Sequence, residues 1–373
     1  MQKVRIALIH EFLGSTKGGQ EEVLREFHAM YPHAPIYTLI ADRKHLGEAY
    51  QGWDIRPSFI QKFPFAQTNF QMYLSLMPQA IESMDLRNFD VVISSSSAFA
   101  KGVLTSPHTL HVCYCHTPTR YLWSDAHTYV QERRVVWPLR AAVTHYLTHL
   151  RMWDRLAADR PDHMIANSKA VQGRIERYYR RASQIIYPPV DVASFSLGSG
   201  RGDYFLTGGR LVESKRFDMV VQAFNRLRVP LVIFGTGRDE KRLRRMAGHS
   251  VRFAGYLSRE ARAKVFQDAK AFIYPQVEDF GITAVESMAS GRPVIAYGAG
   301  GTLETVHEGV TGTFFQESTW ECLADTVARF NPDVFSPTAL RAHAERFSIE
   351  RFQNEIRTFI ADAWEKHENN TRH

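Results

Sequence analysis

The sequence predicts an α/β protein built from two Rossmann-like, doubly wound parallel sheets, one in each of two domains. The first observation is the alternation of short apolar runs with helical stretches, which is typical of parallel sheets covered by helices. The second is a single interruption of that alternation at residues 187–191, where two prolines stop regular structure before a new set starts at Tyr204. The third is the length of 373 residues, which is enough for two separate cores.

Strands are expected where short apolar runs are bounded by polar or glycine residues. In the first half these runs are residues 4–9, 34–40, 91–94, 111–116 and 163–168, with a helix over 21–31. In the second half they start at Tyr204 and include 230–234 and 271–275, and a helix over 283–291 ends at Gly291 as its C-cap.

The same signals set the domain boundaries. We expect one domain over residues 1–188, a second over 189–350, and a C-terminal helical part over 351–373. Apolar residues at 352, 356, 359, 360 and 363 lie on one face of that last helix, so it needs a partner surface.

Composition favours a cytoplasmic enzyme. The three cysteines, Cys113, Cys115 and Cys322, give neither a disulfide framework nor a Cys-x-x-Cys metal spacing. The N-terminus enters strand-like sequence without a signal-peptide pattern, and no window of about 18 apolar residues predicts a membrane-spanning helix.

Most of the net charge of +7 lies in one segment. Residues 131–181 hold eleven Lys or Arg against five Asp or Glu and mix these cations with aromatic side chains. This pattern fits a peripheral contact with an anionic membrane, and it fits equally well amphipathic helices whose basic face is in solvent. Nucleic acid is not expected as a partner, because no nucleic-acid-binding motif accompanies the charge.

Two carboxylates, Glu278 and Glu286, flank a turn from the strand at 271–275 into the helix at 283–291. Ligands of open parallel sheets bind beyond the carboxyl ends of the strands, and a helix N-terminus there attracts anions. The amides around Gly281, Ile282, Thr283 and Ala284 suit phosphate, and the two carboxylates suit sugar hydroxyls. The pattern therefore predicts a nucleotide-sugar site, although acids in the first turn of a helix are also common without any ligand.

A second anion-binding pattern lies upstream. Gly208 and Gly209 follow a strand and allow a ligand to approach the backbone, and Arg210 and Lys215 offer a planar fork and a point charge to phosphate oxygens. A third glycine turn at Gly235 lacks the last glycine of a dinucleotide fingerprint, which disfavours a hydride-transfer enzyme.

A glycine-rich loop also precedes the first helix. Gly14 and Gly19 have the separation of a Walker A motif, but Gln20 replaces its lysine, so a nucleotide triphosphatase is disfavoured.

These residues resemble the signature of glycosyltransferase family 4, which consists of retaining enzymes of the GT-B fold with a cleft between two Rossmann-like domains. The resemblance rests on the Glu pair with Phe280-Gly281 after the first acid, and on the Gly-Arg-Leu run with a downstream lysine. It implies that the N-terminal domain binds the acceptor, that the C-terminal domain binds the nucleotide-sugar donor, and that the last helix returns to the first domain.

The resemblance also implies residue roles. Glu286 would bind the ribose, Glu278 the transferred hexose, and Arg210 and Lys215 the diphosphate. His116, at the end of a strand, matches a functional histidine of the family and is expected to titrate near working pH, although a lone histidine is more often structural. The remaining donor-side residues of this hypothesis are Gly208, Gly209 and Gly235 in the glycine turns, Gly18 and Gly19 beside the phosphates, and Tyr256 and Leu257 beside the base.

The stretch from Cys115 through Trp123 resembles a narrower subgroup, the bacterial mannosyltransferases of O-antigen and exopolysaccharide assembly, which use GDP-mannose. It implies His10, Arg120, Tyr121 and Trp123 as acceptor-side contacts, and a glycan or a polyprenyl-diphosphate-linked oligosaccharide as acceptor. No Asp-x-Asp triplet occurs, so no metal site and no cofactor are expected.

Three alternatives remain open at the level of sequence. The donor could be a UDP-sugar, the enzyme could be a GT-B phosphorylase or epimerase, or the chain could be a non-catalytic basic module that binds membranes or nucleic acid.

Overall fold

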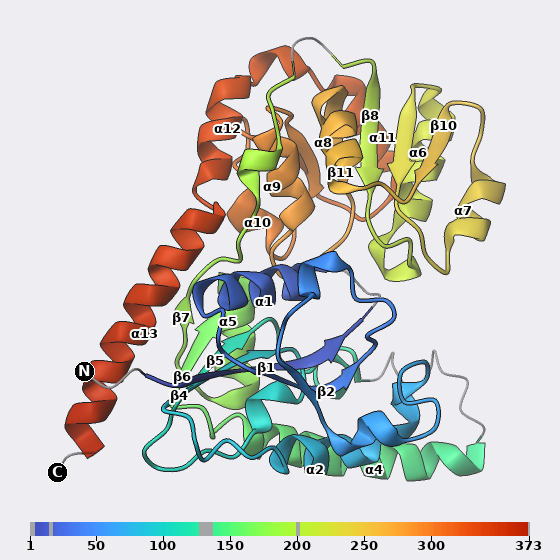
Figure 1. The fold of residues 1–373 in the computed structure, drawn as a ribbon. Helices are drawn as coiled ribbons and strands as arrows, with labels where there is room; N and C mark the ends of the chain where they lie inside the picture. Colours follow the sequence, from blue (N-terminus) through green and yellow to red (C-terminus); the bar gives the residue numbers. More distant parts are fainter. Residues whose placement is uncertain (1–3, 15–17, 127–136, 199–201, 372–373) are drawn as a thin grey trace. The chain divides into compact units, whose positions relative to one another are not determined.

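The computed structural model describes residues 4–371 except 15–17, 127–136 and 199–201. The described chain divides into two compact units, of which the first comprises Met1–Tyr187 with Gln353–His373 and the second Pro188–Phe352. The long last helix, α13 (Ile349–Thr371), starts in the second unit and continues in the first (Figure 1). It begins two residues before the helical part expected over 351–373.

The first unit contains, within its described residues, a seven-stranded parallel sheet in the order β3-β2-β1-β4-β5-β6-β7. Its central strands are buried because helices cover both faces, as expected for a doubly wound sheet. Its strands are β1 (Ile6–Leu13), β2 (Ile36–Ala41), β3 (Ile55–Pro57), β4 (Val91–Ser96), β5 (Leu110–Cys115), β6 (His163–Ala166) and β7 (Gln184–Ile185). Its helices are α1 (Gly19–Met30), α2 (Met77–Glu82), α4 (Trp137–Ala157) and α5 (Lys169–Arg174).

The second unit contains a six-stranded parallel sheet in the order β10-β9-β8-β11-β12-β13, counted over its described residues. The strands are β8 (Tyr204–Gly208), β9 (Leu231–Phe234), β10 (Val251–Gly255), β11 (Ala269–Tyr274), β12 (Val294–Tyr297) and β13 (Gly312–Phe315). The helices are α6 (Phe217–Leu227), α7 (Glu240–Met246), α8 (Arg259–Gln267), α9 (Ile282–Ala289), α10 (Thr302–Thr305), α11 (Trp320–Arg329) and α12 (Pro337–Glu345).

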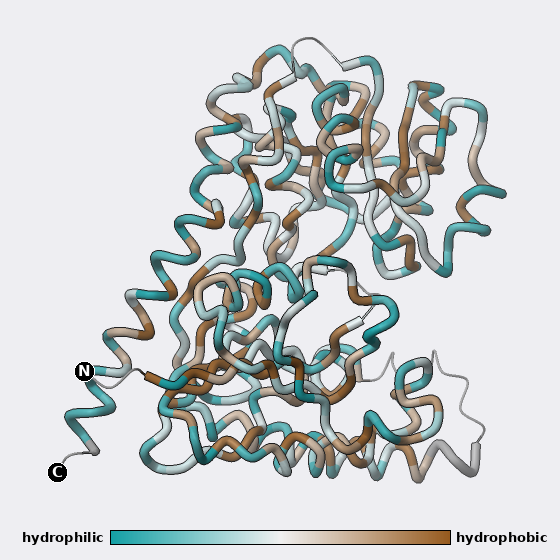
Figure 2. The backbone as a smooth tube through the Cα atoms, viewed as in Figure 1, coloured by the Kyte–Doolittle hydropathy of each residue, from teal (hydrophilic) through white to brown (hydrophobic). Residues whose placement is uncertain are grey.

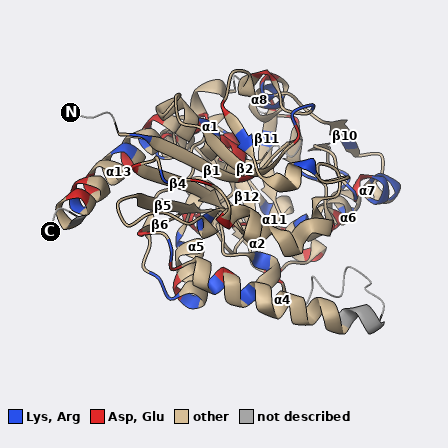
Figure 3. Ribbon diagram, turned by 60° about the horizontal axis from the view of Figure 1, so that its bottom comes forward, with Lys and Arg blue, Asp and Glu red and all other residues tan. Residues whose placement is uncertain are grey.

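Each sheet has its own hydrophobic core. In the first unit, strand residues such as Ile9 and Val92 belong to the same core as Leu147 and Leu150 of α4. Apolar residues, brown in Figure 2, run along the strands of both units. Charged residues lie mainly on helices, among them α4, α7, α8 and α13 (Figure 3). This separation explains why apolar runs located the strands.

Several expected elements agree with the structure to within two or three residues, including α1, β4, β5, β9 and α9. The strands β3 and β7 have three and two residues and lie at the edges of their sheet, so their runs are too short to be recognised. The strands β10, β12 and β13 were also missed. The runs of β10 and β13 contain a polar residue and a glycine, whereas β12 is an apolar run of only four residues.

Candidate active site

The turn from β11 into α9 depends on Gly281, the N-cap of α9. Its φ of +96° lies in the left-handed region, where a residue with a side chain is strained. A Cβ added there would lie 3.3 Å from the Tyr274 hydroxyl, so the glycine also makes room for that side chain. The turn places Glu278 before the helix and Glu286 in its second turn.

Glu286 is a buried carboxylate with one partner. Its side chain is 6% exposed, and its Oε1 lies 2.8 Å from a guanidinium nitrogen of Arg262 on α8. Its Oε2 is buried and has no hydrogen-bond donor in the described part of the chain. Burial raises the pKa of Glu286 above its usual value, and the nearby Arg262 and Arg259 act in the opposite direction.

Glu278 is held by two different donors. The ammonium of Lys215 lies 2.7 Å from Oε1, and the hydroxyl of Tyr274 donates to Oε2 over 2.7 Å. Burial, followed by the charge of Glu278, raises the pKa of Tyr274 well above its usual value, so the phenol stays protonated and remains a donor. The structure thus brings together Glu278 and Lys215, which sequence reasoning placed in one site.

The glycines after β8 and β9 serve more than one purpose. A Cβ at Gly208 would lie 2.5 Å from the ring of Phe234, and one at Gly235 would lie 1.8 Å from the Gly209 carbonyl oxygen. Both positions therefore need glycine for backbone packing. Gly209, with φ of +134°, faces Lys215, and Arg210 is exposed beside it. Phe234 thus fills the space beside Gly208, whereas Gly209 faces the Lys215 ammonium, and the close approach of a ligand at the glycine pair stays a prediction.

The amides at the start of α9 are not equivalent. The N–H of Ala284 donates to the Gly281 carbonyl over 3.0 Å, so it is engaged within the turn. Ile282 and Thr283 supply the first two amides of the helix, which have no acceptor within a regular helix. Among the amides that the sequence assigns to phosphate, those of Ile282 and Thr283 are therefore not used by the first turn of the helix.

A glycine pair missed by sequence reasoning supports the same turn. Gly301 donates its N–H to the Glu278 carbonyl over 2.8 Å, and a Cβ at Gly301 would lie 2.4 Å from the Asp279 carbonyl oxygen. Gly300, with φ of +70°, approaches the same backbone. The run Gly298-Ala299-Gly300-Gly301 directly after β12 was the available signal.

Tyr256 and Leu257 follow β10, an edge strand of the second sheet. Tyr256 is largely exposed and Leu257 is half-buried. Their role beside the base stays a prediction.

In the first unit, a serine joins two of the predicted histidines. Ser95 Oγ lies 3.2 Å from His10 Nδ1 and 2.8 Å from His116 Nε2. His10 and Ser95 are register partners on β1 and β4, and His116 directly follows β5. One hydroxyl proton cannot serve both rings, so at least one ring donates its N–H to the oxygen. Ser95 was missed, although the polar run 94–97 at a strand end marked it.

The expectation that His116 titrates near working pH is wrong. Burial, and to a smaller extent the neighbouring His10, lower the pKa of His116 to about 3. Burial also lowers the pKa of His10, against the opposing charge of Glu11. Both rings are therefore neutral at neutral pH, and they act as hydrogen-bonding groups rather than as cations.

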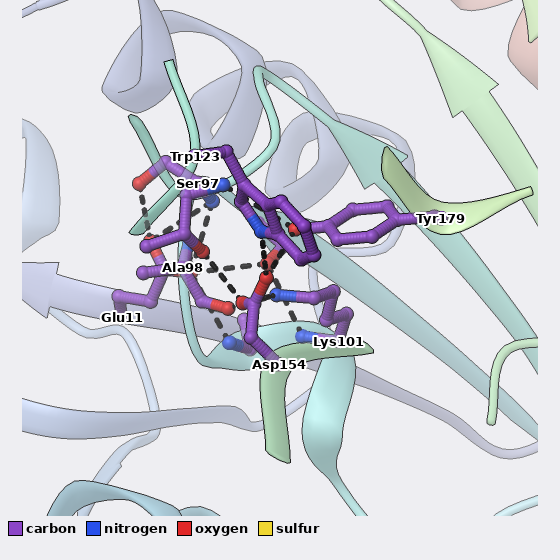
Figure 4. A network of polar contacts seen from close by, with 10 residues as sticks. Glu11, Ser97, Ala98, Lys101, Trp123, Asp154 and Tyr179 are labelled. Carbon is purple, nitrogen blue, oxygen red and sulfur yellow. Dashed lines mark hydrogen bonds and ion pairs between the residues drawn. The ribbon is translucent and has the colours of Figure 1, made fainter. Parts of the chain in front are cut away.

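Two further buried carboxylates hold the loop after β4 from either side (Figure 4). Glu11 accepts from the Ser97 hydroxyl over 2.6 Å and from the Ala98 amide over 2.6 Å. On the other side, the ammonium of Lys101 donates to the Ala98 carbonyl and lies 2.6 Å from Asp154 Oδ1. The side chains of Lys101 and Asp154 are 2% and 1% exposed.

Asp154 also fixes the segment that carries the acceptor-side residues. It accepts from the Thr119 hydroxyl over 2.6 Å, the Trp123 indole N–H over 2.7 Å and the Tyr179 hydroxyl over 2.9 Å. Trp123 stacks on Tyr178 with ring centroids 5.1 Å apart. Trp123 is thus already engaged in the packing of its own unit.

The other predicted residues of this unit lie in a short turn after β5 and at the start of α1. Arg120 and Tyr121 are half-buried in the short turn at Arg120–Leu122. Gly18 and Gly19 open α1, where the Gly18 carbonyl accepts from Glu21 and Glu22. Their roles stay predictions.

The basic segment 131–181 uses many of its cations within the unit. Arg151 donates to the Leu122 carbonyl over 2.5 Å, Arg155 pairs with Asp159 at 2.7 Å, and Arg181 donates to carbonyls such as that of Ala158. Residues 131–136 of the segment lie outside the described residues. Its contact with a membrane stays a prediction.

The fold and the site define a class of protein with two parallel α/β sheets, in which carboxylates, cations and helix amides lie at the carboxyl edge of the second sheet. Comparison with known proteins agrees with this class. The family model described as "Glycosyltransferase Family 4" matches residues 17–194, and the model "Glycosyl transferases group 1" matches residues 193–346. The chain belongs to glycosyltransferase family 4 and is a glycosyltransferase.

Individual relatives are distant. A GDP-mannose-dependent alpha-mannosyltransferase of Corynebacterium glutamicum is 33% identical over 28% of this chain and 25% of its own. The alpha-1,3/1,6-mannosyltransferase ALG2 of Candida glabrata is 22% identical over 96% of this chain and 93% of its own. The first four curated relatives are matched over only 12–35% of their own length.

The solved structures support the fold. Alr3699/HepE of Anabaena, crystallised in complex with UDP, is similar with a TM-score of 0.70 at 16% identity, over 95% of this chain and 100% of that one. The predicted fold class, GT-B with two parallel α/β sheets, is confirmed. The finer subgroup expected from the Cys115–Trp123 stretch is not resolved, because the matched relatives include mannosyltransferases and other transferases at low identity.

Proposed function

We propose that this enzyme transfers a hexose from a nucleotide sugar, with retention at the anomeric carbon, to a glycan or a polyprenyl-diphosphate-linked oligosaccharide of a bacterial surface polysaccharide. GDP-mannose is the favoured donor, because mannosyltransferases occur among the relatives and the Corynebacterium enzyme is named for GDP-mannose. A UDP-sugar is the alternative, since the similar Anabaena structures contain UDP and UDP-glucose.

The observation that carries the proposal is the second oxygen of Glu286. A buried acceptor without a donor destabilises a protein by about 1–3 kcal/mol, so such an atom calls for an explanation. A ribose hydroxyl would supply the missing donor, while Arg262 keeps the first oxygen oriented. In this proposal Glu286 binds the ribose at the second turn of α9.

The ion pair of Lys215 and Glu278 supports a neighbouring place for the sugar and the diphosphate. An ammonium has three donors, so Lys215 can bind Glu278 with one and phosphate oxygens with the others. Arg210 and the amides of Ile282 and Thr283 add further donors for phosphate. Glu278, oriented by Tyr274, would then accept from hydroxyls of the hexose.

The proposed reaction needs no nucleophile from the protein. The bond between the anomeric carbon and the diphosphate oxygen breaks, and an acceptor hydroxyl forms a bond to that carbon on the same face. Its proton passes to the departing phosphate. Lys215, Arg210 and the helix amides stabilise the charge that develops on the diphosphate, which is commonly the largest contribution to the rate.

The first unit supplies the proposed acceptor side. His116 and His10 are neutral and joined through Ser95, so at most one of them would offer its N–H to sugar or phosphate oxygens, and the ring that donates to Ser95 would present an acceptor nitrogen. Arg120, Tyr121 and Trp123 remain proposed contacts of the acceptor, and Gly18 and Gly19 of the donor phosphates.

We also propose that the enzyme acts in the cytoplasm at the inner face of the plasma membrane, where a lipid-linked acceptor would be reached. Among the described residues, none of the helices combines the length and the apolar composition that crossing a bilayer requires.

Calorimetric titration with GDP and UDP, followed by assays with their sugars, tests the proposal. We expect one nucleoside diphosphate to bind clearly more tightly and sugar transfer to require an added acceptor. Release of a sugar phosphate with inorganic phosphate alone would indicate a phosphorylase, and conversion of the donor sugar without an acceptor would indicate an epimerase. Either result would overturn the assignment as a transferase.

A further inference from the structure

A segment of the first unit between β3 and α2 has an unusual composition. Between Asp54 and Glu82 the chain contains no Asp or Glu, but it contains five aromatic residues and several other large apolar ones. We call residues 62–76 of this segment the Phe65 loop. Its first residue ends the 3-10 turn Phe59–Lys62, and over the described residues the regular element that follows within the loop is the 3-10 turn Phe70–Leu76.

The Phe65 loop is held in a defined conformation. The Tyr73 hydroxyl donates to the Pro64 carbonyl over 2.7 Å, and the Asn69 amide donates to the Phe65 carbonyl over 2.8 Å. Phe70 packs on Phe12 of β1 with ring centroids 4.5 Å apart. Some of its aromatic residues therefore anchor the loop to the core of the first unit.

Two large apolar side chains of the same loop point away from that core. Phe65 is 73% exposed and Met72 is 61% exposed. Phe65 also has a φ of +56°, in the left-handed region that a bulky residue rarely adopts. The fold thus holds an aromatic residue in an unfavourable conformation with its ring in solvent, where it contributes little packing to the unit.

The helix α4 contacts the Phe65 loop, and the acid nearest in sequence to the loop, Glu82, accepts from the Trp153 indole of this helix over 2.8 Å. The Tyr146 hydroxyl of α4 donates to the Leu74 carbonyl over 2.9 Å, so α4 lies beside the loop. Between Glu132 and Asp154 the sequence has no acidic residue, and Met152 on α4 is exposed. Lys62 is exposed at the start of the loop.

We propose that the Phe65 loop binds the surface of an anionic lipid bilayer, with Phe65 and Met72 inserted among the acyl chains and Lys62 beside the headgroup phosphates. Apolar burial supplies most of the affinity, because aromatic and methionine side chains each gain substantially when they leave water. A single cation adds a smaller, salt-sensitive share. An apolar surface without acidic residues is not repelled by anionic lipid, which favours this occupant over a basic protein partner. This property does not depend on the proposed sugar transfer.

Sedimentation of the full chain with vesicles tests the proposal directly. We expect binding to vesicles of phosphatidylglycerol and phosphatidylcholine, and weaker binding to phosphatidylcholine alone. Phe65→Asn and Met72→Gln should each lower the partition constant on the order of tenfold. Lys62→Glu should lower binding several-fold on anionic vesicles only.

Matched variants on the second unit serve as controls. Val334→Gln and Leu303→Gln remove comparably exposed apolar side chains, and Lys241→Glu reverses an exposed cation. Vesicle binding by these three variants should equal that of the unmodified chain.

Phe65→Asn also separates binding from folding. Asn tolerates positive φ, so this variant should unfold at the same or a higher urea concentration while its vesicle binding falls. No binding of the unmodified chain to either vesicle type would overturn the proposal. So would losses in the loop variants no larger than those in the controls.

Discussion

The ammonium of Lys215 lies 2.7 Å from Glu278 Oε1, although the two residues are on different loops of the second sheet. The other carboxylate oxygen accepts from Tyr274 at the same distance. Glu278 is therefore fixed at both oxygens, and a side chain fixed in this way presents its remaining lone pairs in one direction.

Removing the Tyr274 hydroxyl should affect turnover more than donor binding. In Tyr274→Phe, Glu278 keeps its ion pair but loses one orienting donor, so we expect kcat to fall about tenfold, equivalent to about 1.4 kcal/mol, with donor KM nearly unchanged. Steady-state kinetics measures both. Tyr204→Phe, which removes a hydroxyl bonded to the Val265 carbonyl, is the control. Equal effects in the two variants would mean that Tyr274 has only a structural role.

Glu286→Ala should weaken binding of the nucleoside diphosphate by about 2–4 kcal/mol, because ribose hydrogen bonds to a carboxylate are lost. Calorimetry with the ribose and 2′-deoxyribose forms of the same diphosphate sharpens the test. The unmodified enzyme should discriminate between them, and the variant should not. Glu260→Ala, an exposed acid on α8, provides a matched control. Unchanged affinity in Glu286→Ala would remove the ribose role from this residue.

Arg262→Met should raise the pKa of Glu286 further, because burial would no longer be opposed by its principal cation. Diphosphate affinity should then decline at a higher pH on acidification than in the unmodified enzyme. Titrating affinity between pH 5 and 8 shows the shift. The double variant Arg262→Met, Glu286→Gln should be less destabilised than the sum of its single changes, since no unpaired buried charge remains.

Two buried histidines should make the first unit sensitive to acid. Burial lowers the pKa of His116 and of His111 to about 3, whereas the unfolded chain titrates near 6.5. Below pH 6.5 only the unfolded state takes up these protons. Each residue therefore removes about 1.4 kcal/mol of unfolding free energy per pH unit as the pH falls toward 3.

Urea unfolding at pH 7.5 and 5.5 measures this loss. His111→Gln, which keeps a polar side chain but does not titrate, should reduce the pH dependence by about 1.4 kcal/mol over that interval. If the unfolding free energy of His111→Gln depended on pH as strongly as that of the unmodified chain, the buried neutral His111 would not be a cause of the acid sensitivity.

Asp154→Ala should destabilise the protein by about 3–5 kcal/mol, because it leaves the buried Lys101 ammonium without its counter-charge. The segment at Thr119 and Trp123 would lose its common acceptor as well. Asp159→Ala, at a surface pair, should change unfolding free energy by less than about 1 kcal/mol. A small effect at Asp154 would show that the network is not a structural anchor.

Much of the fold and part of the site followed from local patterns. Apolar runs located strands such as β4 and β9, because burial on both faces of a parallel sheet requires continuous apolar sequence. The Glu278–Glu286 spacing around Gly281 predicted the strand-to-helix turn, because both acids and the glycine lie within one local element.

The tertiary structure decided what depends on residues far apart in the sequence. Arg262 lies 24 positions from Glu286, and no local pattern reveals that their side chains meet. The pKa of His116 is lowered because the folded unit buries this side chain beside His10 and Ser95. The sequence alone suggests a histidine that titrates near working pH. Local sequence determines the backbone path and the apolar pattern, whereas desolvation and ion pairing arise only when separate strands and helices pack together.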